Sequence, residues 1–255
     1  MIGRLIGMVH LGPLPGSPAF SGDMDAILRN AVADATVLAD AGFDAILIEN
    51  FGDAPFFADD VPDATVASIT RAATEVRSAV SIPIGINVLR NDAIAAISIA
   101  SAVGASFVRI NVLTGAMTTD QGPIVGKAAE VARLRTALGS HIEIAADVMV
   151  KHAVPPPGLT MADAARDTWE RGGADALVVS GSSTGDPVAA GDLKALRDAV
   201  PDAPILIGSG ANSATVADLL RIANGVIVGT AIKVGGSTTA AVDPAAAAAL
   251  VAAAG

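Results

Sequence analysis

Short apolar runs recur along the chain, and most of them end in a polar residue or a glycine. There are eight such runs: residues 5–10, 45–50, 82–87, 107–111, 142–147, 176–181, 204–210 and 225–230. The stretches between them are rich in alanine and have the apolar spacing of helices. A short strand followed by a helix, repeated eight times, is the pattern of an α/β fold of the (β/α)8 TIM-barrel type. We therefore predict a single TIM-barrel domain over residues 1–255.

The connecting segments carry the start and stop signals of helices. In residues 25–41 apolar side chains recur every three or four positions, and a glycine follows. Residues 160–171 begin with Thr160 and Asp163, three apart, which resembles a capping box. The alanine-rich tail, residues 243–254, begins with Asp-Pro, a favourable helix start. We expect this tail to be the last helix of the barrel.

Alternation within the runs predicts which side chains face the barrel interior, because successive side chains of a strand point to opposite faces. We expect the apolar set to face the helices: Ile46, Ile48, Ile84, Ile86, Val88, Val108, Ile110, Ile142 and Ile144. We expect the other set to face inward: Glu49, Gly85, Asn87, Phe107, Arg109, Asn111, Glu143, Ala145 and Asp147. The inward polar residues fall mostly near the C-terminal ends of the strands.

The C-terminal ends of the strands are where TIM barrels place their chemistry. The candidate site therefore consists of the polar residues at these ends: His10, Glu49, Asn50, Asn87, Arg109, Asn111, Asp147, Ser180, Ser209 and Thr230. Each of them can also serve only to satisfy another polar side chain inside the barrel.

Two carboxylates are the candidate general bases, Glu49 and Asp147. A carboxylate in a barrel mouth loses hydration, which favours its accepting a proton. Arg109 can pair with one of them and turn it into a counter-ion. His10 and His152 are candidates for acid or base work near neutral pH, whereas Lys151 lies past the strand end and is predicted to contact the ligand.

We predict no cofactor, with one alternative. His10, Glu49 and Asp147 come from separate strands, and their nitrogen and oxygen atoms suit a divalent metal such as Mg²⁺, Mn²⁺ or Zn²⁺. The sequence shows no metal-ligand spacing that would favour this alternative.

Glycine-rich turns follow the last two strands. Gly208, Ser209 and Gly210 follow the seventh run, and Gly229 and Thr230 follow the eighth. Small residues let backbone N–H groups approach an anion, and many barrels bind phosphate at these two positions. We predict a phosphate site here, to which Ser213 and Lys233 can add donors; the alternative is a pair of tight turns without a ligand.

A third small, hydroxyl-rich loop spans residues 180–185 after the sixth run. Ser180 and Gly181 open it. We expect it to extend the anion site or to hold a sugar; a flexible surface loop is the other reading.

Two further segments can cover the mouth. Gly122 to Lys127 resembles a P-loop, but three residues instead of four separate its glycines and alanine follows the lysine. We exclude a nucleoside triphosphatase and interpret residues 114–126 as a long loop and candidate lid. Phe56 and Phe57 can close over a ligand, contact a second subunit or pack in the core.

Composition narrows the choice of partners. The chain has 255 residues, no cysteine and a formal net charge of −10. Disulfides and thiolate metal sites are excluded, and the acidity argues against a nucleic-acid partner. The apolar runs are too short for a membrane span or a signal peptide. We expect a cytoplasmic homo-oligomer.

Several segments resemble one protein family. MVHLGPLPGSP (8–18), DAILIENFGDAPF (44–56), GINVLRND (85–92), FVRINVLTGAM (107–117) and IAADVMVKHA (144–153) are similar to segments of the BtpA/SgcQ family, as are VVSGSSTGDP, GSGAN and VIVGTAIKVGG. The resemblance implies a relative of the ribulose-phosphate-binding barrels. One cyanobacterial member is linked to accumulation of photosystem I, and members in organisms without photosynthesis imply a more general activity. The family supplies no reaction. The candidate residues in these segments are His10, Glu49, Asn50, Asn87, Arg90, Asn91, Arg109, Asn111, Asp147, Lys151 and His152.

We therefore expect an enzyme that binds a small phosphorylated metabolite, a sugar or nucleoside phosphate, and transfers protons as an isomerase, epimerase or aldolase-type lyase does. The expected catalytic residues are Glu49, Asp147, His10 and Arg109. The expected substrate-binding residues are Asn50, Asn87, Arg90, Asn111, Lys151, His152 and Ser180. The expected phosphate-binding residues are Gly181, Gly208, Ser209, Gly210, Gly229 and Thr230. A non-catalytic assembly factor and a metal-dependent hydrolase are the alternatives.

Overall fold

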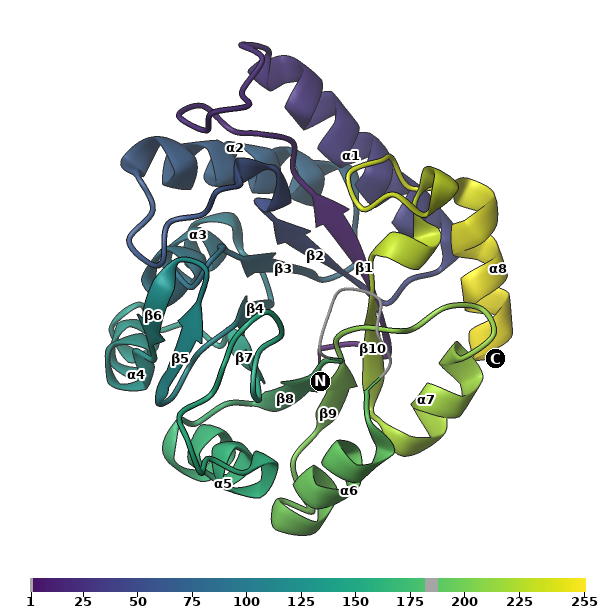
Figure 1. Ribbon diagram of the computed structural model, residues 1–255. Helices are drawn as coiled ribbons and strands as arrows, with labels where there is room; N and C mark the ends of the chain where they lie inside the picture. Colours follow the sequence, from purple (N-terminus) through teal and green to yellow (C-terminus); the bar gives the residue numbers. More distant parts are fainter. Residues whose placement is uncertain (1, 182–187) are drawn as a thin grey trace.

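Eight parallel strands close into a barrel in the computed structural model, which describes residues 2–181 and 188–255 (Figure 1). Around the ring the strands are β1 (Leu5–His10), β10 (Gly225–Val228), β9 (Ile205–Ile207), β8 (Ala176–Val179), β7 (Glu143–Asp147), β4 (Phe107–Ile110), β3 (Ile84–Asn87) and β2 (Ala45–Glu49), which pairs with β1 again. All eight predicted strands are present, and the predicted TIM-barrel fold is confirmed.

Helices alternate with the strands and cover the outside of the barrel. They are α1 (Met24–Ala41), α2 (Asp63–Ala79), α3 (Ala93–Val103), α4 (Ala128–Ala137), α5 (Met161–Arg166), α6 (Ala190–Ala199), α7 (Val216–Ile222) and α8 (Pro244–Ala254). A π-helical turn continues α5 over Asp167–Arg171. Across residues 2–181 and 188–255, no helix combines the length and the apolar character that crossing a bilayer requires.

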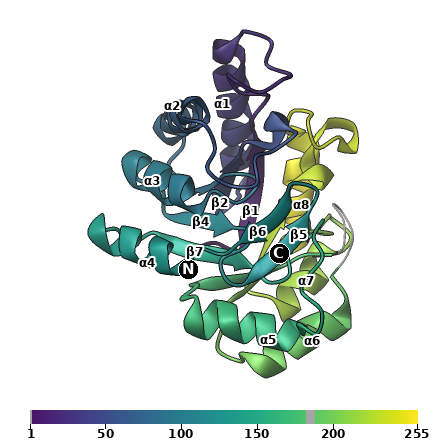
Figure 2. The same cartoon turned by 60° about the vertical axis from the view of Figure 1, so that its left-hand side comes forward.

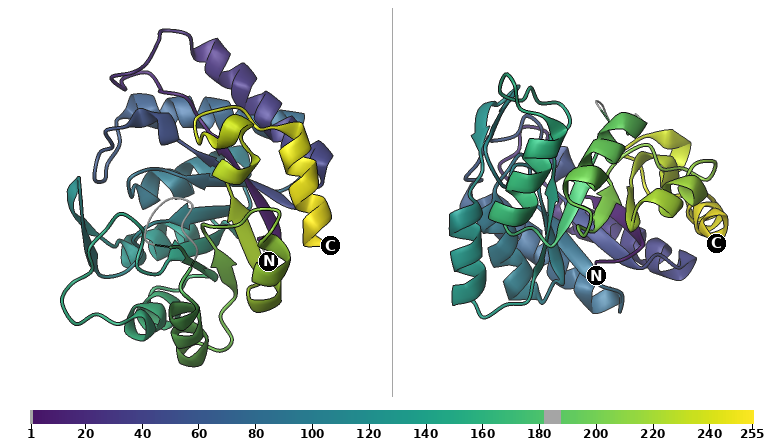
Figure 3. Two further views of the ribbon diagram at one scale, coloured as in Figure 1. Left: turned by 45° about the vertical axis from the view of Figure 1, so that its right-hand side comes forward. Right: turned by 90° about the horizontal axis from the view of Figure 1, so that it is seen from below.

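The helix signals read from the sequence act as expected. Thr160 caps α5, because its hydroxyl accepts from the Asp163 backbone N–H at 3.1 Å. Asp243 caps α8 by accepting from the N–H groups of Ala245 and Ala246. Helix α8 packs against both α7 and α1 and so joins the last helix of the ring to the first (Figure 3).

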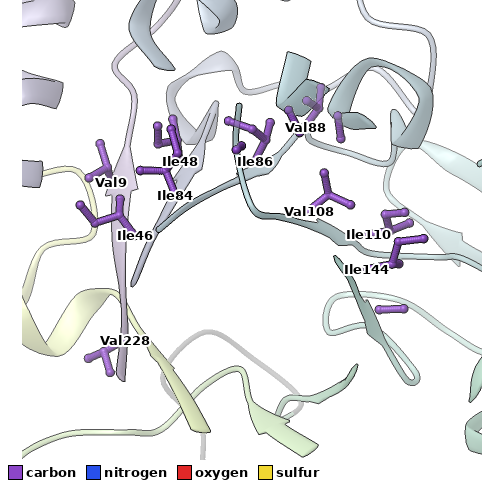
Figure 4. Packing of buried hydrophobic residues seen from close by; sticks show 14 of the residues in the cluster. Val9, Ile46, Ile48, Ile84, Ile86, Val88, Val108, Ile110, Ile144 and Val228 are labelled. Atoms are coloured by element: carbon purple, nitrogen blue, oxygen red, sulfur yellow. The ribbon is translucent and has the colours of Figure 1, made fainter. Parts of the chain in front are cut away.

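The core has two layers, one on each face of the strands. The outer layer packs between strands and helices and contains the predicted outward set, including Ile46, Ile86, Val108 and Ile144 (Figure 4). The inner layer fills the barrel with Ile2, Ile6, Met8, Ala45, Leu47, Phe107, Ala145, Ala176, Val178, Leu206 and Ile227. The predicted alternation of side chains is therefore confirmed by the membership of the two layers.

Gly85 shows why a small residue is needed inside the barrel. A Cβ at this position would lie 2.3 Å from the ring of Phe107, on the neighbouring strand β4. The missing side chain gives the Phe107 ring the space that it needs to fill the interior.

The segment after β4 is not the long loop that the sequence predicts. It forms an antiparallel hairpin, β5 (Ala116–Thr119) and β6 (Gly122–Val125), which stands outside the ring of strands (Figure 2). Met117 and Ile124 are buried and pack with Val112 and Val150. Residues 116–125 do not alternate between apolar and polar positions, so the sequence carried no clear strand signal here. The tip of the hairpin reaches the mouth of the barrel.

Candidate active site at the mouth of the barrel

A cavity of about 690 Å³ opens at the C-terminal ends of the strands. Its volume is within the range of small-molecule sites. Residues from the ends of most strands line it: Met8, His10, Glu49, Phe51, Phe56, Leu89, Arg90, Arg109, Asn111, Asp120, Gln121, Lys151, His152, Gly208, Ser209, Gly210, Ala211, Asn212, Ile227, Gly229, Thr230, Ala231, Gly236 and Thr238. The strand ends therefore bring most of the predicted site residues together.

A buried network built on Arg109 and Asp147 lies at one side of this cavity. Nη2 of Arg109 donates to both carboxylate oxygens of Asp147 at 3.0 Å, and Asn111 donates to Oδ2 at 2.8 Å. Burial would lower the pKa of the Arg109 guanidinium, but the charges of Asp147 and Glu49 outweigh it and raise that pKa. Both oxygens of Asp147 are therefore occupied, and it acts here as the counter-ion of Arg109.

His10 and Glu49 form a second pair, at the ends of the neighbouring strands β1 and β2. Nε2 of His10 lies 3.7 Å from Oε1 of Glu49, and both side chains are almost fully buried. Nδ1 lies 3.0 Å from the carbonyl oxygen of Thr238, which can only accept, so Nδ1 carries the proton. The ring of Phe51 packs against the imidazole, with 4.8 Å between the ring centroids.

The protonation state of His10 suits a proton acceptor. Burial lowers the pKa of His10 below 6.5, and this outweighs the opposing attraction of Glu49. Near neutral pH the imidazole is therefore uncharged, and its Nε2 lone pair is directed toward Glu49 and the cavity. Within the described residues, no hydrogen bond ties up the Glu49 carboxylate. Two groups able to accept a proton thus lie side by side.

Arg90 and Lys151, which we call the cationic wall, line another side of the cavity. Nη2 of Arg90 donates to the carbonyl oxygen of Lys151 at 2.7 Å and so joins the segments after β3 and β7. Burial lowers the pKa of the Arg90 guanidinium. Burial, and next the charge of Arg109, lowers the pKa of the Lys151 ammonium below 10.5. Arg90 is buried, and Lys151 is partly buried.

Residues 208–211 and 229–231, which we call the amide wall, line the cavity at the ends of β9 and β10. A Cβ would clash at one of its glycines and would be tightly packed at another. A Cβ on Gly208 would lie 2.5 Å from Oγ of Ser180, and one on Gly229 would lie 3.2 Å from Cε1 of His10. The chain can therefore bring its backbone close to a ligand here.

Several backbone donors of the amide wall find no acceptor among the described residues. The N–H groups of Gly210, Ala211, Thr230 and Ala231 donate no hydrogen bond to any residue that the structure describes. Unpaired N–H groups at the start of a helical turn are common, but here they come from two adjacent loops beside one cavity. Such convergence is what binds an anion through the main chain.

Lys233 does not add its charge to this wall, contrary to the expectation. Its ammonium is buried outside the barrel and pairs with Asp34 of α1 at 2.6 Å. The other oxygen of Asp34 accepts from the Val242 N–H at 2.7 Å. The ion pair anchors residues 230–243, including Thr238, which orients His10.

The remaining predicted residues have other surroundings. Asn50 exchanges two hydrogen bonds with the Leu89 backbone, and Asn87 donates to Asn111 and to the Arg109 carbonyl, so both hold neighbouring segments together. Neither lines the cavity. Oγ of Ser180 is buried behind Gly208 without a hydrogen-bond partner among the described residues.

Gly181, Ser209 and His152 are the remaining predicted positions, near the end of β8, of β9 and of β7. The N–H of Gly181 donates to Oγ of Ser209 at 2.8 Å. His152 lines the cavity with φ +57°, and Met149 before it has φ +52°; such left-handed backbone is costly for side-chain-bearing residues and is concentrated at functional sites. Residues 182–187 lie outside the described residues.

The metal alternative is not favoured by the geometry. The oxygens of Asp147 face Arg109 and Asn111, so His10, Glu49 and Asp147 do not converge on one point. The group of possible metal ligands found among the described residues is instead Asp59, Asp60 and Asp92. Lys127 pairs with Asp59 at 2.5 Å and with Asp60 at 3.2 Å, and these acids lie outside the cavity.

Some cavity residues were not predicted from the sequence. Asp120 and Gln121 reach it from the tip of the β5–β6 hairpin, and Thr238 from the segment before α8. None directly follows a strand of the barrel, so the rule that selected the others misses them. Phe56, for which ligand closure, a subunit contact and core packing were all open, lines the cavity, whereas Phe57 is 57% exposed.

Comparison with known sequences places the chain in a family. The sequence model of the BtpA family matches residues 2–255. The chain belongs to the BtpA family. An uncharacterised protein of Thermococcus kodakarensis is 52% identical over 90% of this chain and 86% of its own length. The photosystem I biogenesis protein BtpA of Synechocystis is 46% identical over 94% of this chain and 84% of its own length. The sgc region protein SgcQ of Escherichia coli is 30% identical over 90% and 85%.

Solved structures share the fold of this BtpA-family chain at low identity. Tryptophan synthase from M. tuberculosis matches 99% of this chain and 94% of its own with a TM-score of 0.63 and 17% identity. Thiamine phosphate pyrophosphorylase from Pyrococcus furiosus matches 99% and 95% with a TM-score of 0.59 and 15% identity. The family resemblance read from the sequence is confirmed, and these structures support the barrel fold alone.

Proposed function

We propose that this protein is an enzyme that binds a small phosphorylated metabolite, a sugar or nucleoside phosphate, in the mouth of the barrel and transfers protons beside a carbonyl group. The observation that carries the proposal is that one cavity joins the amide wall to the His10–Glu49 pair. Unpaired backbone N–H groups suit a phosphate. Names of structural neighbours, such as phosphoribosyl anthranilate isomerase, add support for phosphorylated ligands on this fold.

In this proposal the two acceptors share the proton transfer. Glu49 removes a proton from a carbon next to the carbonyl. The proton is returned by Glu49 itself or, once Glu49 has passed it to the Nε2 lone pair of His10, by that nitrogen. Phe51 on the imidazole and the Thr238 carbonyl on Nδ1 fix the ring, so that Nε2 keeps its direction. Isomerisation, epimerisation and aldol cleavage all need this step. Arg109, neutralised by Asp147, stabilises charge that develops on the carbonyl oxygen.

The first experiment is a thermal-shift panel with inorganic phosphate, sugar phosphates, nucleoside phosphates and divalent metals. A ligand at 100 times its dissociation constant stabilises the folded protein by roughly 2.7 kcal/mol, which is visible as a higher Tm. We expect a selective shift with a phosphorylated compound and a smaller one for Gly208→Ala. Gly191→Ala, at an exposed glycine of α6 with open space around it, is the matched control. A panel in which no phosphorylated compound raises Tm would reject the proposal.

Proton transfer is then tested with the compound that binds. In D₂O, the carbon-bound hydrogen next to the carbonyl should exchange for deuterium, as followed by proton NMR. Exchange should be absent in Glu49→Gln. Unchanged exchange in that variant would remove the assigned base.

An assembly function is the second candidate, because the Synechocystis relative is named for photosystem I biogenesis. Apolar side chains of the kind that partners cover are exposed in Phe57, Val125 and Val154, at 57%, 59% and 67%. This function predicts that variants of the mouth such as Glu49→Gln complement a strain lacking the relative as well as the unchanged protein does. Failure of Glu49→Gln to complement would favour the enzyme.

A further inference from the structure

The strand order places the cationic wall across the mouth from the amide wall. The amide wall follows β9 and β10, which are neighbours in the ring. In the eight-stranded ring β3 lies directly opposite β9, and β4 lies directly opposite β10. Strand β7 is next to β4. Arg90 follows β3 and Lys151 follows β7. A ligand held by its phosphate on the amide wall therefore extends toward Arg90 and Lys151.

The two cations lack a counter-charge. No carboxylate of the described chain lies within 4.0 Å of the nitrogens of Arg90 or Lys151, and the Lys151 ammonium has no hydrogen bond to the described residues. Arg90 is only 7% exposed. Buried charges are ordinarily paired, because leaving water is costly for them. This wall departs from that rule.

The acids nearby are used otherwise. Asp147 is held by Arg109 and Asn111, and Glu49 faces His10. Asp120 at the hairpin tip is exposed to solvent. Asp147 and Glu49 attract both cations from a distance and oppose the lowering of their pKa values, and Asp120 does so for Arg90 alone; burial still lowers both pKa values. Among residues 2–181 and 188–255 no carboxylate pairs with either cation, which leaves both of them available to an anionic ligand.

We infer that the ligand carries a second anionic group, a carboxylate or a phosphate, which binds Arg90 and Lys151 opposite the phosphate on the amide wall. This inference rests on the proposed function. A guanidinium and an ammonium together suit either group. In ring order β2 and β1 lie between β3 and β10, so the middle of such a ligand would lie beside Glu49 and His10. The substrate class is thus a sugar acid phosphate or a sugar bisphosphate.

The test compares three probes by isothermal calorimetry: ribose 5-phosphate, 5-phosphoribonate and ribulose 1,5-bisphosphate. We expect one of the two probes with a second anion to bind at least about tenfold more tightly than ribose 5-phosphate, as one charge-assisted contact implies. Lys151→Gln should abolish this difference and leave the Kd for ribose 5-phosphate within about threefold, since that probe needs only the amide wall. Which probe gains affinity tells a carboxylate from a phosphate.

Controls separate folding and charge effects from the site itself. Lys194→Gln removes an exposed lysine of α6 whose side chain is 76% exposed, and it should keep the full difference between probes. Unfolding curves confirm that Lys151→Gln is folded. The inference is overturned if neither two-anion probe binds more tightly than ribose 5-phosphate, or if Lys151→Gln weakens all three probes equally.

Failure of the proposed function gives a different result. If no phosphorylated probe binds the unchanged protein, the phosphate assignment is wrong, and malonate then tests the cationic wall alone. Malonate binding that Lys151→Gln abolishes and Lys194→Gln preserves would support the second anion site. Malonate that does not bind, or that binds both variants equally, would overturn it.

Discussion

The amide wall and the cationic wall face each other across one cavity and are built in opposite ways. The amide wall uses small residues and backbone N–H groups, whose positions are fixed by β9 and β10. The cationic wall uses two long side chains that reach in from the segments after β3 and β7. Backbone donors depend on close approach, whereas charged side chains depend on protonation and ionic strength. The walls should therefore respond to different changes.

The largest effect, on turnover, is expected from a substitution of Glu49, which lies between the two walls. Such a substitution leaves both of them intact. Glu49→Gln keeps the size of the side chain but removes the base, and general base catalysis contributes about 10²- to 10⁴-fold to turnover. We expect kcat to fall by that factor while ligand Kd changes little. Steady-state kinetics and calorimetry measure the two. Glu75→Gln, at an exposed position of α2, should change neither; equal losses in both variants would dissociate Glu49 from the chemistry.

The next largest effect is expected at the buried Asp34–Lys233 ion pair, which anchors residues 230–243 behind the amide wall. Asp34→Asn leaves Lys233 buried without a counter-charge, and breaking a buried pair in this way costs about 3–5 kcal/mol of unfolding free energy. Urea unfolding measures this loss. The exposed pair of Arg71 and Asp25 provides the control, because Asp25→Asn should cost less than about 1 kcal/mol. Similar losses for the two variants would show that Asp34 anchors nothing.

A methyl group added to the amide wall at Gly208 should disturb that wall alone, because only the amide wall depends on close approach of the backbone. In Gly208→Ala the new Cβ meets Ser180 and Val178 within 3 Å, and overpacking of this kind costs about 1–3 kcal/mol. We expect weaker binding of inorganic phosphate as well, since the amide wall must shift. Thermal unfolding and calorimetry, with Gly191→Ala as control, measure both effects. Phosphate binding that survives unchanged would place the anion elsewhere.

Raising the pH should weaken binding at the cationic wall only. A two-anion probe should then lose its roughly tenfold advantage in affinity over ribose 5-phosphate. Burial lowers the pKa of Lys151 below 10.5, so its ammonium loses its proton earlier than in the unfolded chain. The charge, and with it the extra affinity, is present below that lowered pKa and is lost as the pH rises through it. Calorimetry of 5-phosphoribonate and ribose 5-phosphate between pH 7 and 10 checks this. A parallel rise of both Kd values would contradict it.

Local signals were sufficient for the barrel. An apolar run marks each strand of the barrel. Alternation alone predicted that Ile46, Val108 and Ile144 face the helices. The hairpin over 116–125 was missed, because its residues do not alternate between apolar and polar and the glycines around it resemble those of a loop. The ends of the strands then indicated His10, Glu49 and most other cavity residues, since a closed parallel sheet brings all its C-terminal ends to one rim.

What the sequence determined by itself is the fold, the family and the set of residues at the rim, because these depend on periodicity and on order along the chain. The tertiary structure alone decided the role of each residue. Asp147 is a counter-ion because Arg109 lies within hydrogen-bond distance on the neighbouring strand. Lys233 points away from the cavity because it pairs with Asp34 of α1, outside the barrel. Glu49 and Lys151 stay available because, among the described residues, no hydrogen bond occupies the carboxylate of the one or the ammonium of the other. Electrostatic pairing depends on distances of a few ångströms between residues far apart in sequence, and only the folded chain sets those distances.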